Sequence, residues 1–337
     1  MSNFRVGVVG CGGIAQVHGA VLQHLEGVEL VACADIRPER AAAFAEKFGG
    51  KAYDSMEAML EGEQLDAVHL CTPHYLHTPM VKLAVERGLH VFTEKPPVIN
   101  WEQWEQLQEL AKGPTRVGVC FQNRYNRSVG MLRDILASGK AGKVLGARAF
   151  VTWHREVPYY TESGWRGSLK TEGGGALINQ SVHTLDLLGQ FLGRADRVEA
   201  VMANHHLKGV IEVEDMMEAY IQFGDASALF YATTAHCADS PVLVELVCEN
   251  VTIRMEEQEV TLTWADGTKE HHSLAAPTTA AGGKAYWGAS HGLCIEDFYR
   301  CVREGKPFRN DIPGIKDTAE LMLSVYQSAR EHKVVEL

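Results

Sequence analysis

A glycine-rich turn near the start of the chain, Gly10-Cys11-Gly12-Gly13-Ile14-Ala15, constrains the fold most. An apolar run precedes it and a helical pattern follows it, which is the context of a phosphate-binding strand–turn–helix unit. Gly10 permits the tight turn, Gly12 lets the backbone approach a pyrophosphate, and the small Ala15 allows close packing of helix on strand. The helix N-terminus then offers N–H groups to phosphates. The turn therefore predicts a dinucleotide site.

A carboxylate follows the turn at the distance that such a site requires. Asp35 ends the second apolar run, where it can accept hydrogen bonds from the adenosine ribose hydroxyls. Its charge would repel a 2′-phosphate, which favours NAD over NADP. NADP remains an alternative cofactor, because the Arg37 guanidinium can either stack on adenine or hold that phosphate.

Short apolar runs alternate with helical stretches from the N-terminus to about residue 122. Such alternation is typical of βαβ units with helices on both faces of a parallel sheet. We therefore predict that residues 1–122 form a doubly wound Rossmann domain. Strands are expected over residues 4–10, 28–35, 65–73, 90–96 and 115–122, and helices over 14–25, 38–49, 77–88 and 101–112.

The pattern changes after residue 122, where strand follows strand with polar turns between residues 197 and 272. We predict that residues 123–337 form a second α/β domain around a large, mostly antiparallel open sheet. A further strand is expected over 144–154, helices over 128–138, 176–192, 294–303 and 316–331, and a mobile loop over 275–283.

Composition excludes several classes of function. A net charge of -11 without a long Lys/Arg run argues against nucleic-acid binding. No stretch reaches the ~18 apolar residues of a membrane span, and the N-terminus enters a strand pattern without a signal peptide. The eight cysteines include no C-x-x-C pair. We therefore expect reduced thiols in a cytoplasmic protein, no nucleic-acid or membrane partner, and no metal.

Three further segments carry side chains suited to chemistry. Cys71-Thr72-Pro73-His74 runs on to His77 at the end of one expected strand, and Glu94-Lys95-Pro96 ends another. In open α/β sheets ligands bind beyond the carboxyl ends of the strands, so both loops should face the cofactor. The third segment, 173–186, begins with three glycines and carries Asn179 and His183 one helical turn apart.

In order, the motifs G-x-G-G-I-A, C-T-P-x-x-x-H, E-K-P and G-G-G-x-L-x-N-x-x-x-H-x-x-D resemble those of the glucose-fructose oxidoreductase / inositol dehydrogenase / MocA family. Trp165-Arg166-Gly167 and Ser290-His291 are similar to further elements of its members. The resemblance covers essentially the whole chain. It implies a Rossmann domain followed by an α/β domain whose open sheet carries the substrate site and often a dimer or tetramer interface. We therefore expect a homodimer or homotetramer.

The resemblance also implies roles for individual residues. Lys95 corresponds to the family's catalytic lysine and His183 to its catalytic histidine. These types suit alcohol oxidation, which needs a base for the hydroxyl proton and a cation near the developing alkoxide. Asn179 stands where inositol dehydrogenases of the family carry Asp; an amide can orient the histidine but adds no charge. Asp186 either partners His183 or caps the buried helix face.

The glycine turn, the chemistry of Lys95 and His183 and the family resemblance together predict an NAD(P)-dependent oxidoreductase. It would transfer a hydride between nicotinamide and a secondary alcohol or ketone of a sugar, polyol or sugar derivative. An NAD-dependent glycosidase and a non-catalytic dinucleotide sensor are the alternatives. His74 and His77 are expected to line the nicotinamide end or cap the next helix. The predicted cofactor-binding residues are Gly10, Cys11, Gly12, Gly13, Ile14, Ala15, Asp35, Arg37, Cys71, Thr72, Pro73, His74, His77, Glu94 and Lys95. The predicted substrate-binding residues are Arg124, Tyr125, Trp165, Arg166, Asn179, His183 and Tyr286.

Overall fold

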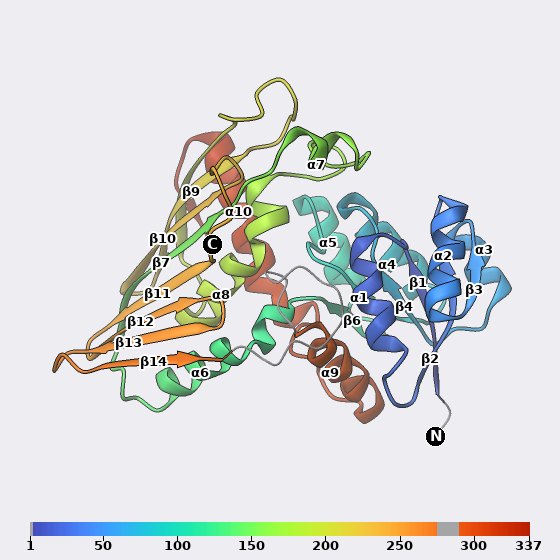
Figure 1. Cartoon of the computed structure of the whole chain (residues 1–337), viewed down its shortest axis with the longest axis horizontal. Helices are drawn as coiled ribbons and strands as arrows, with labels where there is room; N and C mark the ends of the chain where they lie inside the picture. The colour runs from blue at the N-terminus through green and yellow to red at the C-terminus, as the bar shows by residue number, and fades with distance from the viewer. Residues whose placement is uncertain (1–2, 275–289) are drawn as a thin grey trace. The chain divides into compact units, whose positions relative to one another are not determined.

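The computed structural model describes residues 3–274 and 290–337, which divide into two compact units (Figure 1). Unit 1 contains the described residues up to Gln122 together with 290–315, and unit 2 contains 123–274 together with 316–337. The predicted loop at 275–283 and Tyr286 lie outside the described residues.

Unit 1 is built on a six-stranded parallel sheet with the order β3-β2-β1-β4-β5-β6 in the described part of the chain. This confirms the predicted Rossmann fold. The strands are β1 (Phe4–Val9), β2 (Val28–Ala34), β3 (Lys51–Tyr53), β4 (Ala67–Leu70), β5 (His90–Thr93) and β6 (Val117–Val119). The helices are α1 (Gly13–Leu22), α2 (Pro38–Phe48), α3 (Met56–Gly62), α4 (His77–Val85), α5 (Trp101–Leu110) and α9 (His291–Glu304). Helix α1 contacts α2 and α9, whereas α4 contacts α5.

Helix α9 marks a difference from the sequence-based division, which placed every residue after 122 in one domain. Its buried face includes Ile295, Phe298 and Tyr299. The Phe298 ring lies 5.2 Å from that of Phe92 in β5 and 5.5 Å from that of Phe308. The chain thus returns to unit 1 because this aromatic face completes the core on one side of the parallel sheet.

Unit 2 is built on a nine-stranded sheet with the order β14-β13-β12-β11-β7-β10-β9-β8-β15 among the described residues. Only the β7/β10 pair is parallel, which confirms the predicted, mostly antiparallel sheet. Its strands are β7 (Val144–Thr152), β8 (Arg197–Ala203), β9 (Met216–Phe223), β10 (Ala226–Thr233), β11 (Leu243–Cys248), β12 (Val251–Glu256), β13 (Glu259–Trp264), β14 (Lys269–Ser273) and β15 (Val335–Glu336).

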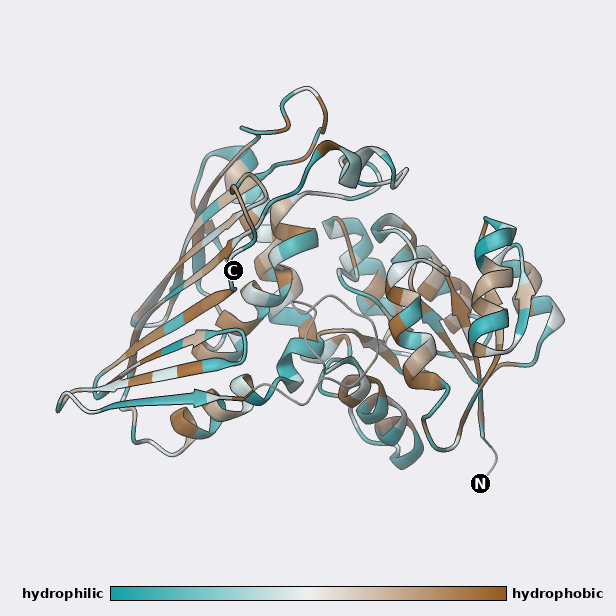
Figure 2. Ribbon diagram, in the orientation of Figure 1, coloured by the Kyte–Doolittle hydropathy of each residue, from teal (hydrophilic) through white to brown (hydrophobic). Residues whose placement is uncertain are grey.

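Helices cover one face of this sheet. Helix α8 (Val182–Leu192) contacts β7 and β10, and α10 (Lys316–Glu331) contacts β8 (Figure 1). Buried and half-buried residues alternate along β12, so one side of this strand faces the core. Figure 2 shows hydrophobic and more polar residues alternating on strands of this sheet. The remaining helices of the described part of unit 2 are α6 (Arg127–Ala137), α7 (Val157–Thr161) and the π-helical turn η3 (Ala176–Ser181).

Two composition-based expectations can be compared with the structure. All eight cysteines are free; Cys237 is exposed and the other seven are buried, as expected for packed thiols. Within residues 3–274 and 290–337, the helices lack the length and apolarity needed to cross a membrane.

Candidate functional site

The carboxyl ends of the parallel strands bring the predicted cofactor segments to one edge of the sheet in unit 1. The glycine turn follows β1, Asp35 follows β2, Cys71 follows β4, and Glu94 follows β5. Gly10 has a φ of +84°, and a Cβ placed there would lie 2.7 Å from the Cys71 carbonyl oxygen. Gly10 is therefore required by the close approach of two strand-end loops.

The next two glycines leave open space. A Cβ at Gly12 or Gly13 would meet no other described atom within 4 Å, and helix α1 begins at Gly13. A helix N-terminus with unobstructed backbone N–H groups is an anion-binding site. The turn therefore has room for a dinucleotide pyrophosphate. Any side chain larger than that of glycine at either position would occupy this space.

Asp35 is fixed beside this turn. One carboxylate oxygen accepts a hydrogen bond from the Cys11 N–H at 2.8 Å, and the other accepts one from the Arg37 N–H at 2.8 Å. The carboxylate thus connects the end of β2 to the glycine turn. Arg37 is the N-cap of α2 and its side chain is exposed.

His77 connects the other two loops of the edge. It is fully buried, and its ring nitrogens lie 2.9 Å from the Thr72 carbonyl and 2.6 Å from the Pro96 carbonyl. The Lys95–Pro96 peptide is cis. The ring of His74, also buried, lies 6.1 Å from that of His77. His77 therefore holds the loop after β4 against the loop that carries Lys95.

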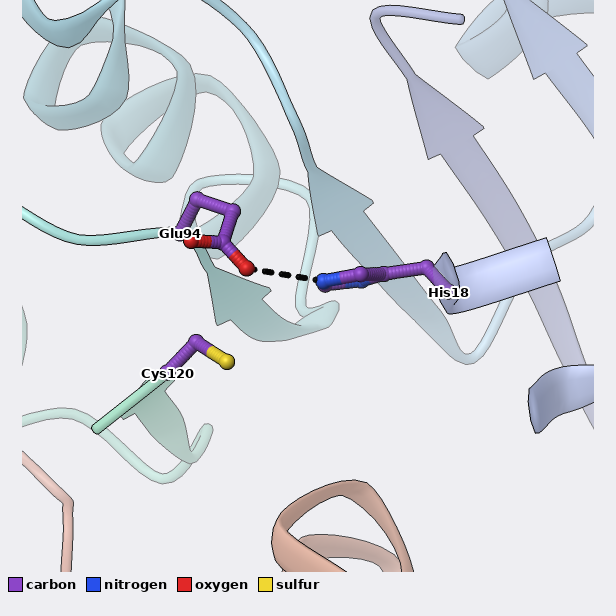
Figure 3. A group of neighbouring side chains, drawn as sticks. All are labelled: His18, Glu94 and Cys120. Carbon is purple, nitrogen blue, oxygen red and sulfur yellow. Dashed lines mark hydrogen bonds and ion pairs between the residues drawn. The ribbon is translucent and has the colours of Figure 1, made fainter. Parts of the chain in front are cut away.

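A buried hydrogen-bonded chain leads to Glu94, the residue before Lys95. The Tyr299 hydroxyl forms a hydrogen bond with His69 at 2.9 Å, and the Nδ1 atoms of His69 and His18 lie 2.8 Å apart. His18 in turn forms a hydrogen bond of 2.9 Å with Glu94, drawn in Figure 3. If Tyr299 donates first and each neutral ring then donates onward, every bond is satisfied and Glu94 accepts as a carboxylate. Burial alone would raise the pKa of Glu94, but the hydrogen bond from His18 holds it below its ordinary value.

Cys120 lies close to this chain. The candidate ligand atoms of His18, Glu94 and Cys120 lie within 4.8 Å of one another, a group that could hold a metal ion. Two ligands of one tetrahedral zinc ion, at bond lengths of about 2.05 Å, lie roughly 3.3 Å apart. His18 and Glu94 are closer than that and bonded directly. The pair therefore fits a hydrogen bond, and we derive no metal chemistry from it.

The contribution of buried His69 and His77 to stability should fall as the pH drops from about 7.5 to 5.5, whereas the raised pKa of the Glu172 carboxyl acts in the opposite direction. Burial lowers the pKa of both His69 and His77, whereas their unfolded counterparts take up a proton near pH 6.5. At these two sites the unfolded state binds more protons below that pH, so each neutral buried histidine costs about 1.4 kcal/mol per pH unit until it titrates in the folded state. Urea unfolding of the parent protein and of a variant that lacks one of the rings, measured across this range, isolates this contribution.

The His69→Asn variant tests the assignment, because it removes one of these rings. The unfolding free energy of the parent protein minus that of the variant should decrease as the pH falls through this range. Parallel pH dependences for parent and variant would show that His69 does not contribute.

In unit 2 the glycine run allows close contacts that position Asn179 and His183. A Cβ at Gly174 would lie 2.0 Å from the Tyr326 hydroxyl, and one at Gly175 would lie 2.0 Å from the Glu214 carbonyl oxygen. The predicted helix 176–192 begins as the π-helical turn η3 and continues as α8. Asn179 therefore lies in a π-helical turn, a conformation frequent at functional sites, and His183 lies in the first turn of α8.

A polar cluster surrounds Asn179. Its amide nitrogen lies 2.5 Å from a Glu172 oxygen and 3.3 Å from the Tyr159 hydroxyl. Gln180 also donates to that hydroxyl, at 2.7 Å. The Arg166 guanidinium lies 4.4 Å from the Tyr159 ring centroid and 4.7 Å from that of Trp165. The predicted residues Trp165, Arg166 and Asn179 are thus neighbours.

Sequence reasoning missed three groups that the structure places around Asn179 and the glycine run. Glu172 holds the Asn179 amide, Gln180 holds Tyr159, and Glu214 accepts hydrogen bonds from the N–H groups of Gly175 and Leu177. The only signal in the sequence was the position of Glu172 directly before the glycine run.

Arg124, predicted to contact substrate, instead forms a buried ion pair within unit 2. It is 2% exposed, and its Nε lies 2.9 and 3.2 Å from the two oxygens of Asp186. Thr318 donates to the same carboxylate. Asp186 therefore pairs with Arg124 at the buried helix face, a partner that neither of its two predicted roles named. Tyr125, in contrast, is half-buried at the end of a 3₁₀ turn.

Arg124→Met should lower the free energy of unfolding by about 3–5 kcal/mol, because removing one partner of a buried pair leaves an uncompensated charge on Asp186. Urea unfolding measures this. Arg300→Met is the matched control: Arg300 of α9 pairs with Glu304 but its side chain is 53% exposed, so a loss below about 1 kcal/mol is expected. Equal losses in both variants would contradict a special role for the buried pair.

Two family models match this chain. The model described as "Oxidoreductase family, NAD-binding Rossmann fold" matches residues 4–121, and the "GFO/IDH/MocA C-terminal domain" matches residues 129–254. Together they cover more than half of the chain and fall on the two units separately.

Curated relatives include a 1,5-anhydro-D-fructose reductase from Ensifer adhaerens, 30% identical over 324 residues that cover 86% of this chain and 95% of the relative. A D-glucoside 3-dehydrogenase from Escherichia coli is 29% identical over 253 residues, or 69% of this chain and 70% of the relative. The crystal structure of the WlbA dehydrogenase from Bordetella pertussis, in complex with NADH and UDP-GlcNAcA, has a TM-score of 0.85 at 26% identity and covers 99% of both chains.

Proposed function

This chain belongs to the GFO/IDH/MocA family of oxidoreductases, and on that basis we propose that it is an NAD-dependent dehydrogenase or reductase acting on a secondary alcohol, or the corresponding ketone, of a sugar, polyol or sugar derivative. One observation carries the proposal: the open space at Gly12 and Gly13 lies at the same sheet edge as the loop that carries Lys95.

The residues of unit 1 that would hold the cofactor are those of the glycine turn and Asp35. The N-terminus of α1 would bind the pyrophosphate, and Asp35 would accept hydrogen bonds from the ribose hydroxyls. When bound, NAD supplies the hydride acceptor or, reduced, the hydride donor. The Asp35 charge disfavours a 2′-phosphate, so NADP is expected to bind more weakly even though Arg37 is close.

Lys95 and His183 are the proposed catalytic residues. The Lys95 ammonium would stabilise negative charge on the substrate oxygen, where a preorganised cation is worth most. His183 would accept the hydroxyl proton during oxidation and return it during reduction, since imidazole titrates near neutral pH. Asn179 would contact the substrate or orient His183 through its amide.

The substrate class rests on unit 2 and on the relatives. Arg166 between the rings of Tyr159 and Trp165 offers a cation and aromatic faces, a combination suited to sugar derivatives that bear an anionic group. The relatives named above act on sugars, and one is bound to a sugar nucleotide.

A substrate panel tests the proposal. Sugars, inositols, sugar acids and sugar nucleotides are incubated with NAD or NADP, and the corresponding ketones with NADH or NADPH, while absorbance of the reduced nicotinamide is followed. Turnover of at least one sugar derivative with NAD preferred over NADP is expected. Absence of NADH and NADPH binding at millimolar concentration would exclude the proposed function.

We also propose that the chain forms a homodimer or homotetramer through the open face of its nine-stranded sheet, and that it acts in the cytoplasm, where its free cysteines would stay reduced. Five large apolar residues on the strands of this sheet are 39–57% exposed: Leu145, Val201, Tyr220, Leu229 and Val247. Leu229 and Tyr220 lie directly opposite one another in β10 and β9, and exposed apolar side chains grouped on a sheet face favour an interaction surface.

Leu229→Glu should convert the oligomer to a monomer, because it places a charge beside Tyr220 in the middle of this face. Light scattering of the eluted protein measures the mass. Ile36→Glu, at an 87% exposed position in unit 1, is the matched control and should leave the mass unchanged. A monomeric parent protein, or an unchanged mass in Leu229→Glu, would contradict the proposed interface.

A further inference from the structure

Glu172 is a buried carboxyl to which the proposed chemistry gives no role. It directly precedes the glycine run and has no exposed surface. One oxygen, Oε2, accepts a hydrogen bond from the Gly167 N–H at 2.5 Å, and the other, Oε1, accepts one from the Asn179 amide at 2.5 Å. Both oxygens are therefore held by donors.

These contacts determine the orientation of the Asn179 amide. An ionised carboxylate only accepts hydrogen bonds, so Nδ2 of Asn179 must face Glu172. The same nitrogen lies 3.3 Å from the Tyr159 hydroxyl. The amide oxygen, Oδ1, consequently points away from Glu172. The charge of Glu172 thus decides which end of the amide points away from it.

The Glu172 carboxyl changes its charge close to neutral pH. Burial raises its pKa to about 7, against the hydrogen bonds from Gly167 and Asn179 and the charge of Arg166, while Glu214 raises it further. Other titratable groups that interact with Glu172 include Tyr159 and Tyr160 of α7 and Tyr326 of α10. The three tyrosines have pKa values raised mainly by burial, so they stay neutral where Glu172 titrates.

Geometry selects the oxygen that takes the proton. The Gly167 N–H can only donate, and the carbonyl oxygen of a carboxylic acid is a stronger acceptor than its hydroxyl oxygen, so Oε2 stays the carbonyl oxygen and the proton binds Oε1. The new O–H group then donates toward Asn179, whose Nδ2 cannot accept. The hydrogen bond is kept only if the amide rotates by about half a turn, which brings Oδ1 to Glu172 and turns Nδ2 away. Gln180 still donates to Tyr159 after this rotation.

We propose that Glu172 and Asn179 form a proton-coupled switch: ionised Glu172 makes Asn179 present a hydrogen-bond acceptor, and protonated Glu172 makes it present a donor. Resting on the proposed function, this switch selects the redox form of the substrate. On binding, a secondary alcohol donates its one hydroxyl hydrogen to Oδ1, which is favoured above the switching pH, and the hydroxyl then turns toward His183 for proton transfer. A ketone accepts from Nδ2 and is favoured below that pH. Glu172 is then a positioning residue that acts through Asn179.

The variant Glu172→Gln should lock the switch. The Gly167 N–H must donate to the amide oxygen of the new glutamine, so the amide nitrogen of that glutamine faces Asn179. This nitrogen donates to Oδ1 of Asn179 and keeps Oδ1 turned toward residue 172, as the protonated carboxyl does. Glu212→Gln is the matched control, because Glu212 is exposed and accepts hydrogen bonds from Ser168 and Leu169 in the same segment.

The first test needs no substrate. In the full-length protein labelled with [¹⁵N]asparagine, the side-chain amide signal of Asn179 is assigned from its loss in Asn179→Asp. It should shift with a midpoint near pH 7 in the parent protein and in Glu212→Gln, and stay constant in Glu172→Gln. A signal that does not titrate in the parent, or that titrates equally in Glu172→Gln, would overturn the switch.

The second test uses a substrate pair found by the panel. Between about pH 6 and 8 the ratio of KM for the alcohol to KM for the ketone should fall about tenfold in the parent protein, the size of one hydrogen bond's net contribution. It should stay near its low-pH value in Glu172→Gln. A ratio equally pH-dependent in both proteins would overturn the role in substrate selection. If no sugar derivative is turned over, the proposed function fails, while the amide signal still decides on the switch.

Discussion

Replacing Lys95 by methionine is expected to lower kcat by about 10²–10⁴-fold while the dissociation constant for NADH changes by less than about threefold. Methionine keeps the length of the side chain and removes the ammonium group. A cation placed where charge develops in the transition state acts on the chemical step, and its loss is typically of this size. Single-turnover kinetics and fluorescence energy transfer from tryptophan to NADH measure the two quantities separately.

Lys82→Met provides the matched control for Lys95→Met. Lys82 lies on α4 in the same unit, and its side chain is 49% exposed with only a long ion pair to Glu86. Neither turnover nor affinity should change in this variant. An equal loss of turnover and NADH affinity in Lys95→Met would instead assign Lys95 a structural role. Unchanged turnover would remove it from the catalytic residues.

Most of the fold was predictable because hydrophobic periodicity identifies long elements. The strand–helix alternation before residue 122 predicted the parallel sheet, yet β3 and α3 were missed. They have three and seven residues, too few for a periodic pattern to emerge. Helix α9 was predicted as a helix, but its amphipathic pattern does not encode which core it covers. That is set by contact with Phe92, about 200 residues away in the sequence.

The loops that form the candidate site could be predicted from the sequence, but the side chains that pair within it could not. Strand ends placed the glycine turn, Asp35 and Lys95 at one edge, since parallel strands end together. The sequence does not show which charged side chains are buried. Arg124 was predicted to bind substrate, but in the structure it pairs with Asp186, 62 residues away. The bond between His69 and Tyr299 spans 230 residues. Such pairs need three-dimensional packing, because residue type alone carries no information on the partner.

Gly12→Val is expected to abolish NADH binding, with a loss of affinity of at least about 100-fold, while the unfolding free energy stays within about 1 kcal/mol of the parent value. The reason lies in the space around the turn. A Cβ at Gly12 would meet no described protein atom within 4 Å, so the protein itself tolerates a side chain there. The same space is where the backbone would approach the pyrophosphate, and a valine would fill it.

Variants of two other glycines distinguish an effect on cofactor binding from an effect on protein stability. Gly10→Val changes the same turn, but its φ of +84° and the Cys71 carbonyl 2.7 Å from the added Cβ make it strongly destabilising. Gly130→Val, on α6, also points into open space and should affect neither property. Urea unfolding without cofactor and NADH energy transfer are measured for all three variants. Normal NADH binding by Gly12→Val would show that the turn does not hold the cofactor. If Gly12→Val unfolded like Gly10→Val, the space beside the helix N-terminus would be needed by the protein itself, and the argument for a pyrophosphate there would fail.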